Sequence, residues 1–282
     1  MLPFRPFRAV TRPLTGLLAC ASVFASVFAS VFASVLAGAI PRSLLAQPWT
    51  TRHQDALWVG TFVDQPISKR TALWFDGSWR RMGMGAEPQQ LLVRPGLQVT
   101  LSPGVRVAAG YGYIATQPYG AFPIANPTRE HRTWQQLTVA HTAGAVSITH
   151  RYRLEQRWLH PLLRVAGEGA GEGDDARTSG PTTYQNRLRY MPRAQVALGS
   201  LTVGGRPVIG YVWDELLMPL GGPTQTFTIG QNRASAGVGI PTGARTRVDV
   251  GYMNLYNAFV PRRANEINHT LWLSMHWTGR WP

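Results

Sequence analysis

The feature that most constrains the fold of this chain is a period-two alternation of side chains, which recurs from residue 55 to the C-terminus. Within residues 145–158, one alternate set is mostly apolar or aromatic, and the intervening set is mostly polar or charged. The same division occurs in residues 104–116 and in the last fifteen or so residues. Because successive side chains of a β-strand point to opposite faces of its sheet, this pattern predicts an all-β fold.

Eleven segments are predicted as strands, and many contain 10 or more residues, about the length that crosses a bilayer with tilt. The predicted strands are 55–63, 70–80, 89–101, 104–116, 130–142, 145–158, 183–198, 206–215, 226–239, 245–256 and 267–281. Short and long turn-rich segments alternate between them, which is typical of a transmembrane antiparallel up-and-down β-barrel. Single-chain bacterial barrels have even strand numbers, so we predict ten to twelve strands, with twelve preferred. Segment 55–63 is then either peripheral or paired with an unrecognised strand.

The first 46 residues have the pattern of a secretory signal peptide. Arginines precede an apolar run at 14–40, in which Ala-Ser-Val-Phe occurs three times, and small residues near Ala39 or Ala46 suit cleavage. The run is long for a signal, so a retained anchor is the alternative. We expect residues 1–46 to be a signal peptide and residues 47–282 to be a single barrel domain exported to the outer membrane of a Gram-negative cell.

The formal charge of +14 comes from 28 Lys and Arg residues against 14 Asp and Glu residues. Four of the basic residues and none of the acidic residues lie in 1–46, so the excess remains +10 after cleavage. Arginines that alternate along exported strands do not form a nucleic-acid patch, so we expect no nucleic-acid partner. The expected partners are outer-membrane lipid, including lipopolysaccharide, and the barrel-assembly machinery. The single cysteine, Cys20, excludes disulfide and thiolate–metal sites.

Charged residues of the central hairpin are predicted to face each other in the lumen. If Ala143-Gly144 is a two-residue turn, Glu130 lies opposite Arg157 and Arg132 lies opposite Glu155. The predicted lumen charge ladder consists of Glu130, Arg132, Arg151, Arg153, Glu155 and Arg157. Further lumen candidates are Arg106, Arg187, Arg189, Asp214, Arg233, Arg247 and Asp249. Such a lumen either is filled by its side chains or forms a narrow, porin-like pore that attracts anions.

Tryptophans distinguish the barrel from a second alternative, a soluble secreted β-sandwich that binds a ligand. A sandwich also alternates, with one face of each sheet packed on the other sheet. Nine tryptophans lie mostly within or at the ends of the predicted strands: Trp58, Trp74, Trp79, Trp134, Trp158, Trp213, Trp272, Trp277 and Trp281. Tryptophan is enriched at membrane–water interfaces, so we interpret these residues as interfacial girdles of a membrane barrel.

Several motifs, taken in order along the chain, resemble one known family. They are 130–137 (EHRTWQQL), 150–157 (HRYRLEQR), 186–190 (NRLRY), 214–215 (DE), 231–233 (QNR), 251–253 (GYM) and 269–271 (HTL). The set is similar to domain-of-unknown-function family 2490 of bacterial envelope proteins, over nearly the whole mature chain. That family resembles a group of outer-membrane β-barrels, so the resemblance implies the same architecture. It implies no activity, because none is established for the family.

Enzyme activity is the remaining alternative. Ser274 and His276 share a face of the last predicted strand and are the candidates for an outer-membrane lipid hydrolase or deacylase, although their order is reversed relative to such enzymes. The sequence identifies no acid to orient the histidine, so we do not favour an enzyme. The seven histidines lack metal-ligand spacing, and Gly110-Tyr-Gly112 lies inside a predicted strand, where glycines relieve crowding. We therefore expect neither a metal nor a cofactor.

Overall fold

The structure is a computed structural model that describes residues 49–164, 177–221, 230–259 and 262–280. The predictions for the leader at 1–46, its cleavage site and Cys20 lie outside the described residues. Residues 49–282 form one compact unit. Among the described residues, no helix has the length and apolar character that would let it cross a membrane.

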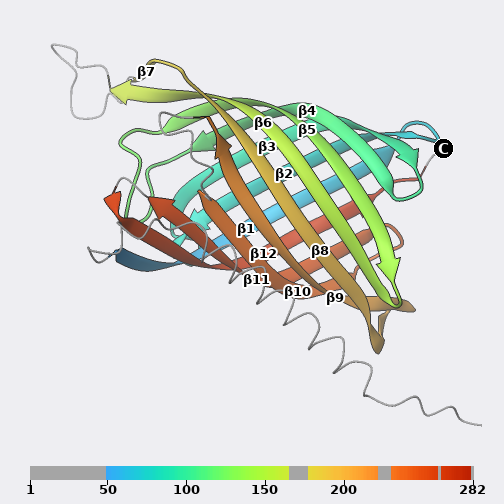
Figure 1. The fold of residues 1–282 in the computed structure, drawn as a ribbon. Coiled ribbons are helices and arrows are strands. Elements are labelled where there is room, and N and C mark those ends of the chain that lie inside the picture. Colours follow the sequence, from blue (N-terminus) through green and yellow to red (C-terminus); the bar gives the residue numbers. More distant parts are fainter. Residues whose placement is uncertain (1–48, 165–176, 222–229, 260–261, 281–282) are drawn as a thin grey trace, which may run out of the picture. The chain divides into compact units, whose positions relative to one another are not determined.

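Twelve β-strands and one short 3-10 helix, η2 (Gly83–Gly85), make up the described part of this unit (Figure 1). The strands are β1 (Thr50–Pro66), β2 (Thr71–Met82), β3 (Glu87–Ser102), β4 (Val105–Thr116), β5 (Thr128–Ala143), β6 (Val146–Arg164), β7 (Arg177–Ser179), β8 (Thr183–Val203), β9 (Arg206–Leu220), β10 (Gln231–Pro241), β11 (Thr246–Phe259) and β12 (Ala264–Thr278). All except β7 overlap one predicted segment each. The all-β prediction is therefore confirmed.

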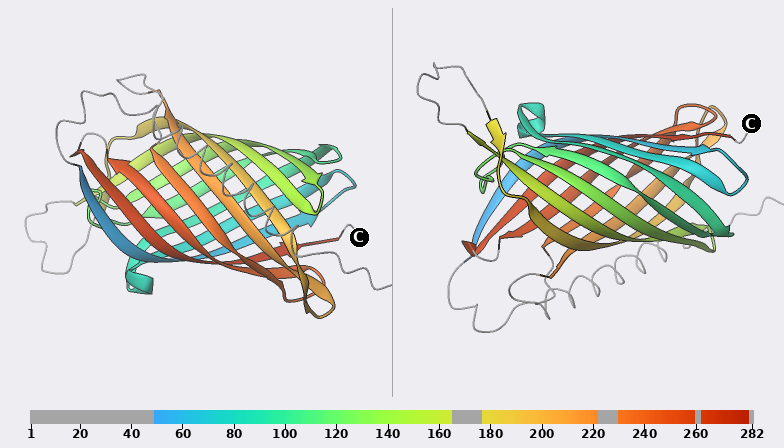
Figure 2. Two further views of the ribbon diagram at one scale, coloured as in Figure 1. Left: turned by 60° about the horizontal axis from the view of Figure 1, so that its bottom comes forward. Right: turned by 90° about the horizontal axis from the view of Figure 1, so that it is seen from above.

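Eleven of the strands pair side by side into a closed barrel, and β5–β6 pairing completes the ring (Figure 2). Strands that follow one another around the barrel are antiparallel, except that β1 pairs in parallel with β12, from Thr50 opposite Ala264 to Asp64 opposite Thr278. An odd number of strands requires one such parallel pair, because the first and last strands then point the same way. The short β7 pairs with the end of β6.

The total of twelve strands lies within the predicted range, but the interpretation of segment 55–63 was wrong. That segment belongs to β1, which is a full barrel strand paired with both β2 and β12. The closure is mixed rather than wholly antiparallel, so the even-number rule does not decide the role of β1 here. Tight connections such as 103–104, 144–145 and 204–205 lie at one end of the barrel, which we call the short-turn end. The opposite end contains 117–127 and is called the long-loop end.

The central hairpin turns one residue later than predicted. Ala143 pairs with Val146, so Gly144 and Ala145 are the two central turn residues. Gly144 has a φ of 60°, in the left-handed region that glycine adopts without steric cost. A positive φ at the first central residue is the geometry of a type II′ hairpin turn, which suits strand twist and requires glycine at that position.

This change of turn moves every predicted pair of the hairpin by two residues. Arg132 lies opposite Arg157, and Trp134 lies opposite Glu155. Because the side-chain period of a strand is two, a shift of two residues keeps each side chain on its predicted face. The predicted face of the hairpin was therefore right, although its register was wrong.

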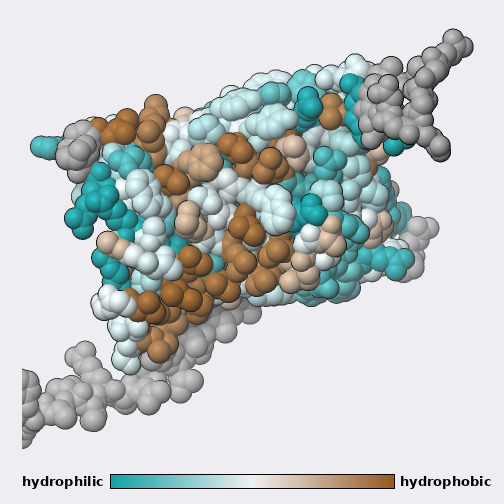
Figure 3. Space-filling model, turned by 180° about the vertical axis from the view of Figure 1, so that it is seen from behind, coloured by the Kyte–Doolittle hydropathy of each residue, from teal (hydrophilic) through white to brown (hydrophobic). Residues whose placement is uncertain are grey.

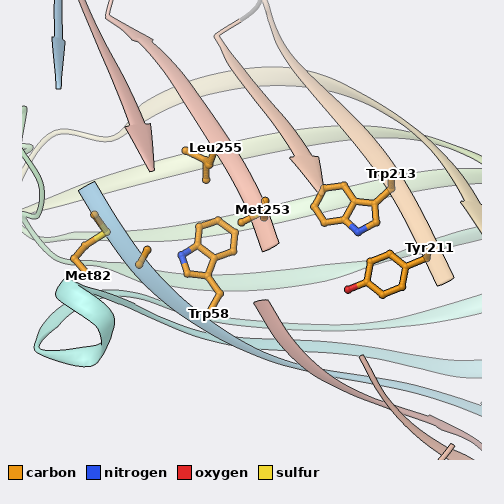
Figure 4. Close-up of a cluster of buried hydrophobic side chains, with 7 residues drawn as sticks. Trp58, Met82, Tyr211, Trp213, Met253 and Leu255 are labelled. Atoms are coloured by element: carbon orange, nitrogen blue, oxygen red, sulfur yellow. The ribbon is translucent and has the colours of Figure 1, made fainter. Parts of the chain in front are cut away.

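Buried apolar side chains fill one side of the barrel interior (Figure 4). This apolar cluster consists of Ala56, Trp58, Met82, Tyr211, Trp213, Met253 and Leu255. The register also places Trp74, Trp134 and Trp272 on the inward face. The girdle interpretation was therefore wrong for five of the tryptophans, because inward tryptophans fill the lumen instead of lying at an interface.

Large apolar side chains lie exposed on the outward face of the strands. Leu73 is 49% exposed, Leu97 is 51% exposed and Trp79 is 46% exposed, and all three have the outward parity of their strands. Figure 3 shows hydrophobic residues gathered over much of the wall on one side of the barrel, with hydrophilic residues concentrated toward the ends. The barrel is thus polar in much of its interior and apolar over much of its outer wall.

Candidate functional site in the barrel lumen

Glu155 of β6 is the most heavily paired carboxylate in the described lumen. Its side chain is fully buried, and it accepts hydrogen bonds from Arg187 at 2.6 Å, from Arg189 at 2.8 Å and from Arg132 at 3.1 Å. Arg94 Nη1 lies 3.6 Å from its Oε1 atom. The four arginines come from β3, β5 and β8. A buried carboxylate is stable as a charge only with such partners, so Glu155 ties three strands to its own.

Two more glutamates extend these contacts through the lumen. Glu130 accepts two hydrogen bonds from Arg157, at 2.8 and 2.9 Å, and its Oε1 lies 2.6 Å from Arg132 Nη2. Glu215 of β9 contacts three arginines, namely Arg151 at 2.7 Å, Arg189 at 2.6 Å and Arg233 at 3.3 Å. Arg94 also pairs with Asp76 of β2. We call this continuous set of residues the lumen network: Asp76, Arg94, Glu130, Arg132, Arg151, Glu155, Arg157, Arg187, Arg189, Glu215 and Arg233.

The lumen network has more arginines than carboxylates. It contains seven arginines and four acids, and Arg80 and Arg153 lie beside it at 8% and 1% exposure without a carboxylate within ion-pair distance among the described residues. Arg153 donates to Gln136 at 2.9 Å and lies 4.8 Å from the Trp134 ring centroid. With all groups charged, these thirteen residues have nine positive and four negative charges, and this local excess of five positive charges is favourable for an anion.

Trp134 fills the middle of the lumen. Its side chain is 0% exposed, and its indole lies against Gly96 and Gly110, which are paired with each other across β3 and β4. A Cβ on either glycine would lie only 2.5 Å from the ring atom Cζ2 of Trp134. Gly110 therefore relieves crowding inside a strand, as predicted, and the two glycines let a large ring occupy this level of the barrel.

The structure brings five of the six predicted ladder residues into the lumen network and places the sixth, Arg153, beside it. Glu130 and Arg157, and Arg132 and Glu155, are in contact despite the changed register, because their side chains reach diagonally between the two strands. Three further candidates, Arg187, Arg189 and Arg233, belong to the lumen network. These nine residues were recognised from strand parity alone.

Asp214 was assigned to the wrong face. Its neighbour Glu215 contacts the lumen arginines, and adjacent residues of a strand point to opposite faces. Asp214 pairs with Ala234 and accepts a hydrogen bond from Asn232 at 2.7 Å, on the face opposite to Glu215. Of the two adjacent acids, the prediction therefore selected the one that does not join the lumen network.

A second charged group lies toward the short-turn end. Asp249 is fully buried and contacts Arg247 at 2.6 Å and Arg193 at 3.2 Å. Arg106 lies 3.7 Å from Asp64 and is 39% exposed at its side chain. The candidates Arg106, Arg247 and Asp249 thus face inward but are separate from the lumen network.

Sequence reasoning missed Arg94, Glu215 and Arg193. Arg94 shares strand parity with the inward-facing Leu92 and Gln98, so the alternation of residues 89–101 contained the signal that could have identified it. Glu215 was available from the same parity argument that failed for Asp214. Arg193 lies in the same strand as Arg187 and Arg189, and the odd parity that it shares with them could have identified it.

Ser274 and His276 lie beside Asp249, an acid that the sequence did not identify as their partner, but the three residues do not form a catalytic relay. Ser274 lies opposite Asp249 across β11 and β12. The same ring atom, His276 Nε2, lies 3.1 Å from Ser274 Oγ and 3.2 Å from Asp249 Oδ2. A relay needs the acid on one ring nitrogen and the nucleophile on the other. Ser274 is also only 2% exposed and faces the lumen.

No group of three or more metal-ligating side chains occurs among the described residues. The described lumen presents a binding surface made chiefly of guanidinium groups, with amide and hydroxyl groups beside them. Such donors recognise carboxylate and phosphate oxygens.

Comparison with known proteins identifies the family to which the chain belongs. An uncharacterized protein from Methylorubrum extorquens is 25% identical over 224 residues, which cover 78% of this chain and 85% of that protein. No solved structure matches the chain. The family model described as "Protein of unknown function (DUF2490)" matches residues 55–266, which include every residue of the lumen network. The chain therefore belongs to domain-of-unknown-function family 2490, as its motifs indicated.

Proposed function

We propose that this protein is an outer-membrane β-barrel that draws small anions into an arginine-rich lumen and is closed to free diffusion by its own side chains. The observation that carries the proposal is the fully buried Glu155, surrounded by four arginines in an interior with excess positive charge. The expected structural role and the expected anion attraction are thus combined in one lumen.

The outer wall supports a location in a membrane. Eleven strands have 11 to 21 residues, which is enough to cross the hydrocarbon core with tilt. A shallow apolar groove on the outer wall is bordered by Leu97, Val99, Leu137, Tyr152, Leu154 and Leu188. In water these side chains would form a large exposed apolar surface, whereas acyl chains of a bilayer would cover them. Outer-membrane lipid and the barrel-assembly machinery are the partners that such a location supplies.

The packing of the lumen supports a closed barrel over an open pore. Trp134 and Glu155 are 0% exposed, and Arg153 is 1% exposed, at a level where neighbouring strands contribute large side chains to the interior. Barrels with few strands are filled by their side chains, whereas barrels of 16 or more strands leave aqueous channels. An anion therefore enters the lumen network without passing freely to the other end.

Planar bilayers test the closed state and the anion preference together. Wild-type protein is expected to give no steady open conductance, because the Trp134–Arg153 level blocks the lumen. The double variant Trp134→Ala, Arg153→Ala is expected to conduct with anion selectivity, since the remaining lumen arginines favour anions. Trp79→Ala removes an exposed tryptophan from the outer wall and is the matched control. Steady conductance of wild type, or cation selectivity of the double variant, would contradict the proposal.

The lipid-hydrolase alternative receives no support from this geometry. His276 Nε2 contacts both Ser274 and Asp249, and the serine lies inside the barrel, away from the apolar outer wall where acyl chains would lie. The soluble β-sandwich alternative would need two packed sheets, whereas these strands form one closed sheet.

A further inference from the structure

A cavity lies in the lumen beside the lumen network. Its volume is about 240 Å³, and Thr116, Tyr119 and Thr128 place it toward the long-loop end. Six arginines line it, namely Arg80, Arg132, Arg157, Arg187, Arg189 and Arg233, with the acid Glu130. The cavity therefore lies where the positive excess of the lumen meets open space.

Trp58 holds two of these arginines close together. Arg80 Cζ lies 3.8 Å and Arg233 Cζ lies 5.2 Å from the centroid of the Trp58 ring. The indole Nε1 donates to Gln89 Oε1 at 2.7 Å, which fixes the orientation of the ring (Figure 4 shows Trp58 projecting into the lumen). A cation–π contact lowers the cost of burying a guanidinium, so one ring brings two like charges to the cavity wall.

Arg80 retains binding capacity, whereas Arg233 has a carboxylate partner, because its Nη1 lies 3.3 Å from Glu215 Oε2. Arg80 donates to Gln90 at 2.6 Å and to Ser78 at 3.2 Å, but no carboxylate of the described residues lies within ion-pair distance. Arg233 is 8% exposed, and its buried Nε has no hydrogen-bond partner among the described residues. An unsatisfied buried donor costs free energy, so the guanidinium of Arg233 is not fully satisfied by its partners Glu215 and Gln231. Burial raises the pKa of the Tyr119 hydroxyl, so this lining group remains a neutral donor.

We propose that this cavity is a binding site for a small phosphate-bearing anion, either inorganic phosphate or a small phosphate monoester. The site deepens the proposed anion-attracting lumen and rests on it. Arginine forks match the oxygens of a tetrahedral phosphate, and more than one fork lines the cavity. A multivalent anion also compensates several excess charges at once, which chloride cannot do.

The size of the cavity restricts the ligand. The volume of about 240 Å³ lies below the range of about 300–1,000 Å³ that is typical of sites for drug-sized ligands. A phosphate group with a few additional atoms fits this volume, whereas an oligosaccharide does not. The arginines point into the lumen rather than toward the outer wall, so a free anion has access that a lipid headgroup in the bilayer lacks.

Calorimetric titration with inorganic phosphate tests the site. The folded full chain, in zwitterionic detergent at constant ionic strength, is expected to bind phosphate saturably. Arg80→Gln should weaken this affinity by about tenfold or more, the loss of one charge-assisted hydrogen bond. The matched control is Arg106→Gln, which removes a lumen arginine near Asp64 and should change the affinity by less than about twofold, since distant exposed charges are screened.

A measurement on wild type keeps the test independent of how well the variants fold. Phosphate should raise the thermal unfolding midpoint more than chloride does at equal ionic strength, because a ligand that binds the folded state stabilises it. Equal effects of the two anions, or equal losses in Arg80→Gln and Arg106→Gln, would overturn the site while leaving a generally anion-attracting lumen intact. Displacement of phosphate by a short-chain phosphatidylglycerol would overturn the assignment to a free anion.

Discussion

Replacing Glu155 by alanine removes the carboxylate on which the lumen network converges. Arg132, Arg189 and Arg94 each keep a second carboxylate, but Arg187 has Glu155 as its only ion-pair partner among the described residues. Removing one partner of a buried ion pair costs about 3–5 kcal/mol. The Arg187 side chain is 16% exposed and can recruit water, so we expect the lower end, about 3 kcal/mol.

Urea unfolding in detergent micelles, followed by the loss of the heat-modifiable gel band, measures this free energy. Glu87→Ala is the control, because Glu87 is an exposed acid at the start of β3 and its loss should cost no more than about 0.5 kcal/mol. The double variant Glu155→Ala, Arg187→Ala should recover about 1–2 kcal/mol, since it no longer leaves Arg187 unpaired.

Two results would refute this reasoning. If Glu155→Ala and Glu87→Ala unfold at the same urea concentration, Glu155 does not organise the lumen. If the double variant is less stable than Glu155→Ala by the full cost of a second independent substitution, Arg187 is not the group that the first substitution leaves unpaired.

Three further predictions concern the packing of Gly110 in the lumen, the outward-facing Leu97 and the candidate nucleophile Ser274. Gly110→Ala should lower stability by about 1–3 kcal/mol, because its Cβ would clash with the backbone oxygen of Pro95 and lie 2.5 Å from Trp134 Cζ2; an unchanged urea midpoint would argue against this packing. Leu97→Arg should cost about 1–4 kcal/mol in lipid vesicles, with the larger cost at greater depth in the bilayer, whereas a neutral effect would indicate that Leu97 faces water. Ser274→Ala and wild type should release fatty acid from envelope lipid at the same background rate. A lower rate of release by Ser274→Ala than by wild type would support the lipid-hydrolase alternative.

Strand parity was enough to predict the fold class and most of the lumen residues. Two long strands carry the alternating residues Glu130, Arg132, Glu155 and Arg157. A change of register by two residues leaves their side chains on the same face, so they lie in the barrel interior in either register. The pairing itself depends on which residues form the turn. Glycine suits either central position of a two-residue turn, so the sequence alone allows a turn at 143–144 or at 144–145. The positive φ of Gly144, as the first of the two turn residues, corresponds to the turn at 144–145.

Features that depend on contacts between distant parts of the chain were harder to predict from the sequence. The parallel contact between β1 and β12 joins segments about 200 residues apart, and no local pattern in either strand specifies the direction of its neighbour. The positions of the tryptophans were mispredicted because they too depend on residues of other strands. A tryptophan such as Trp134 fits a lumen only where glycines on adjacent strands leave space, so its role depends on Gly96 and Gly110 rather than on its own position.

The central claim is that the chain forms a closed barrel in the outer membrane, and heat-modifiable gel migration of the outer-membrane fraction tests it most directly. The protein should fractionate with the outer membrane, and the unheated band should migrate faster than the boiled band, because the folded barrel is compact and resists the detergent. Recovery in the soluble periplasmic fraction, with a mobility that heating does not change, would contradict the claim.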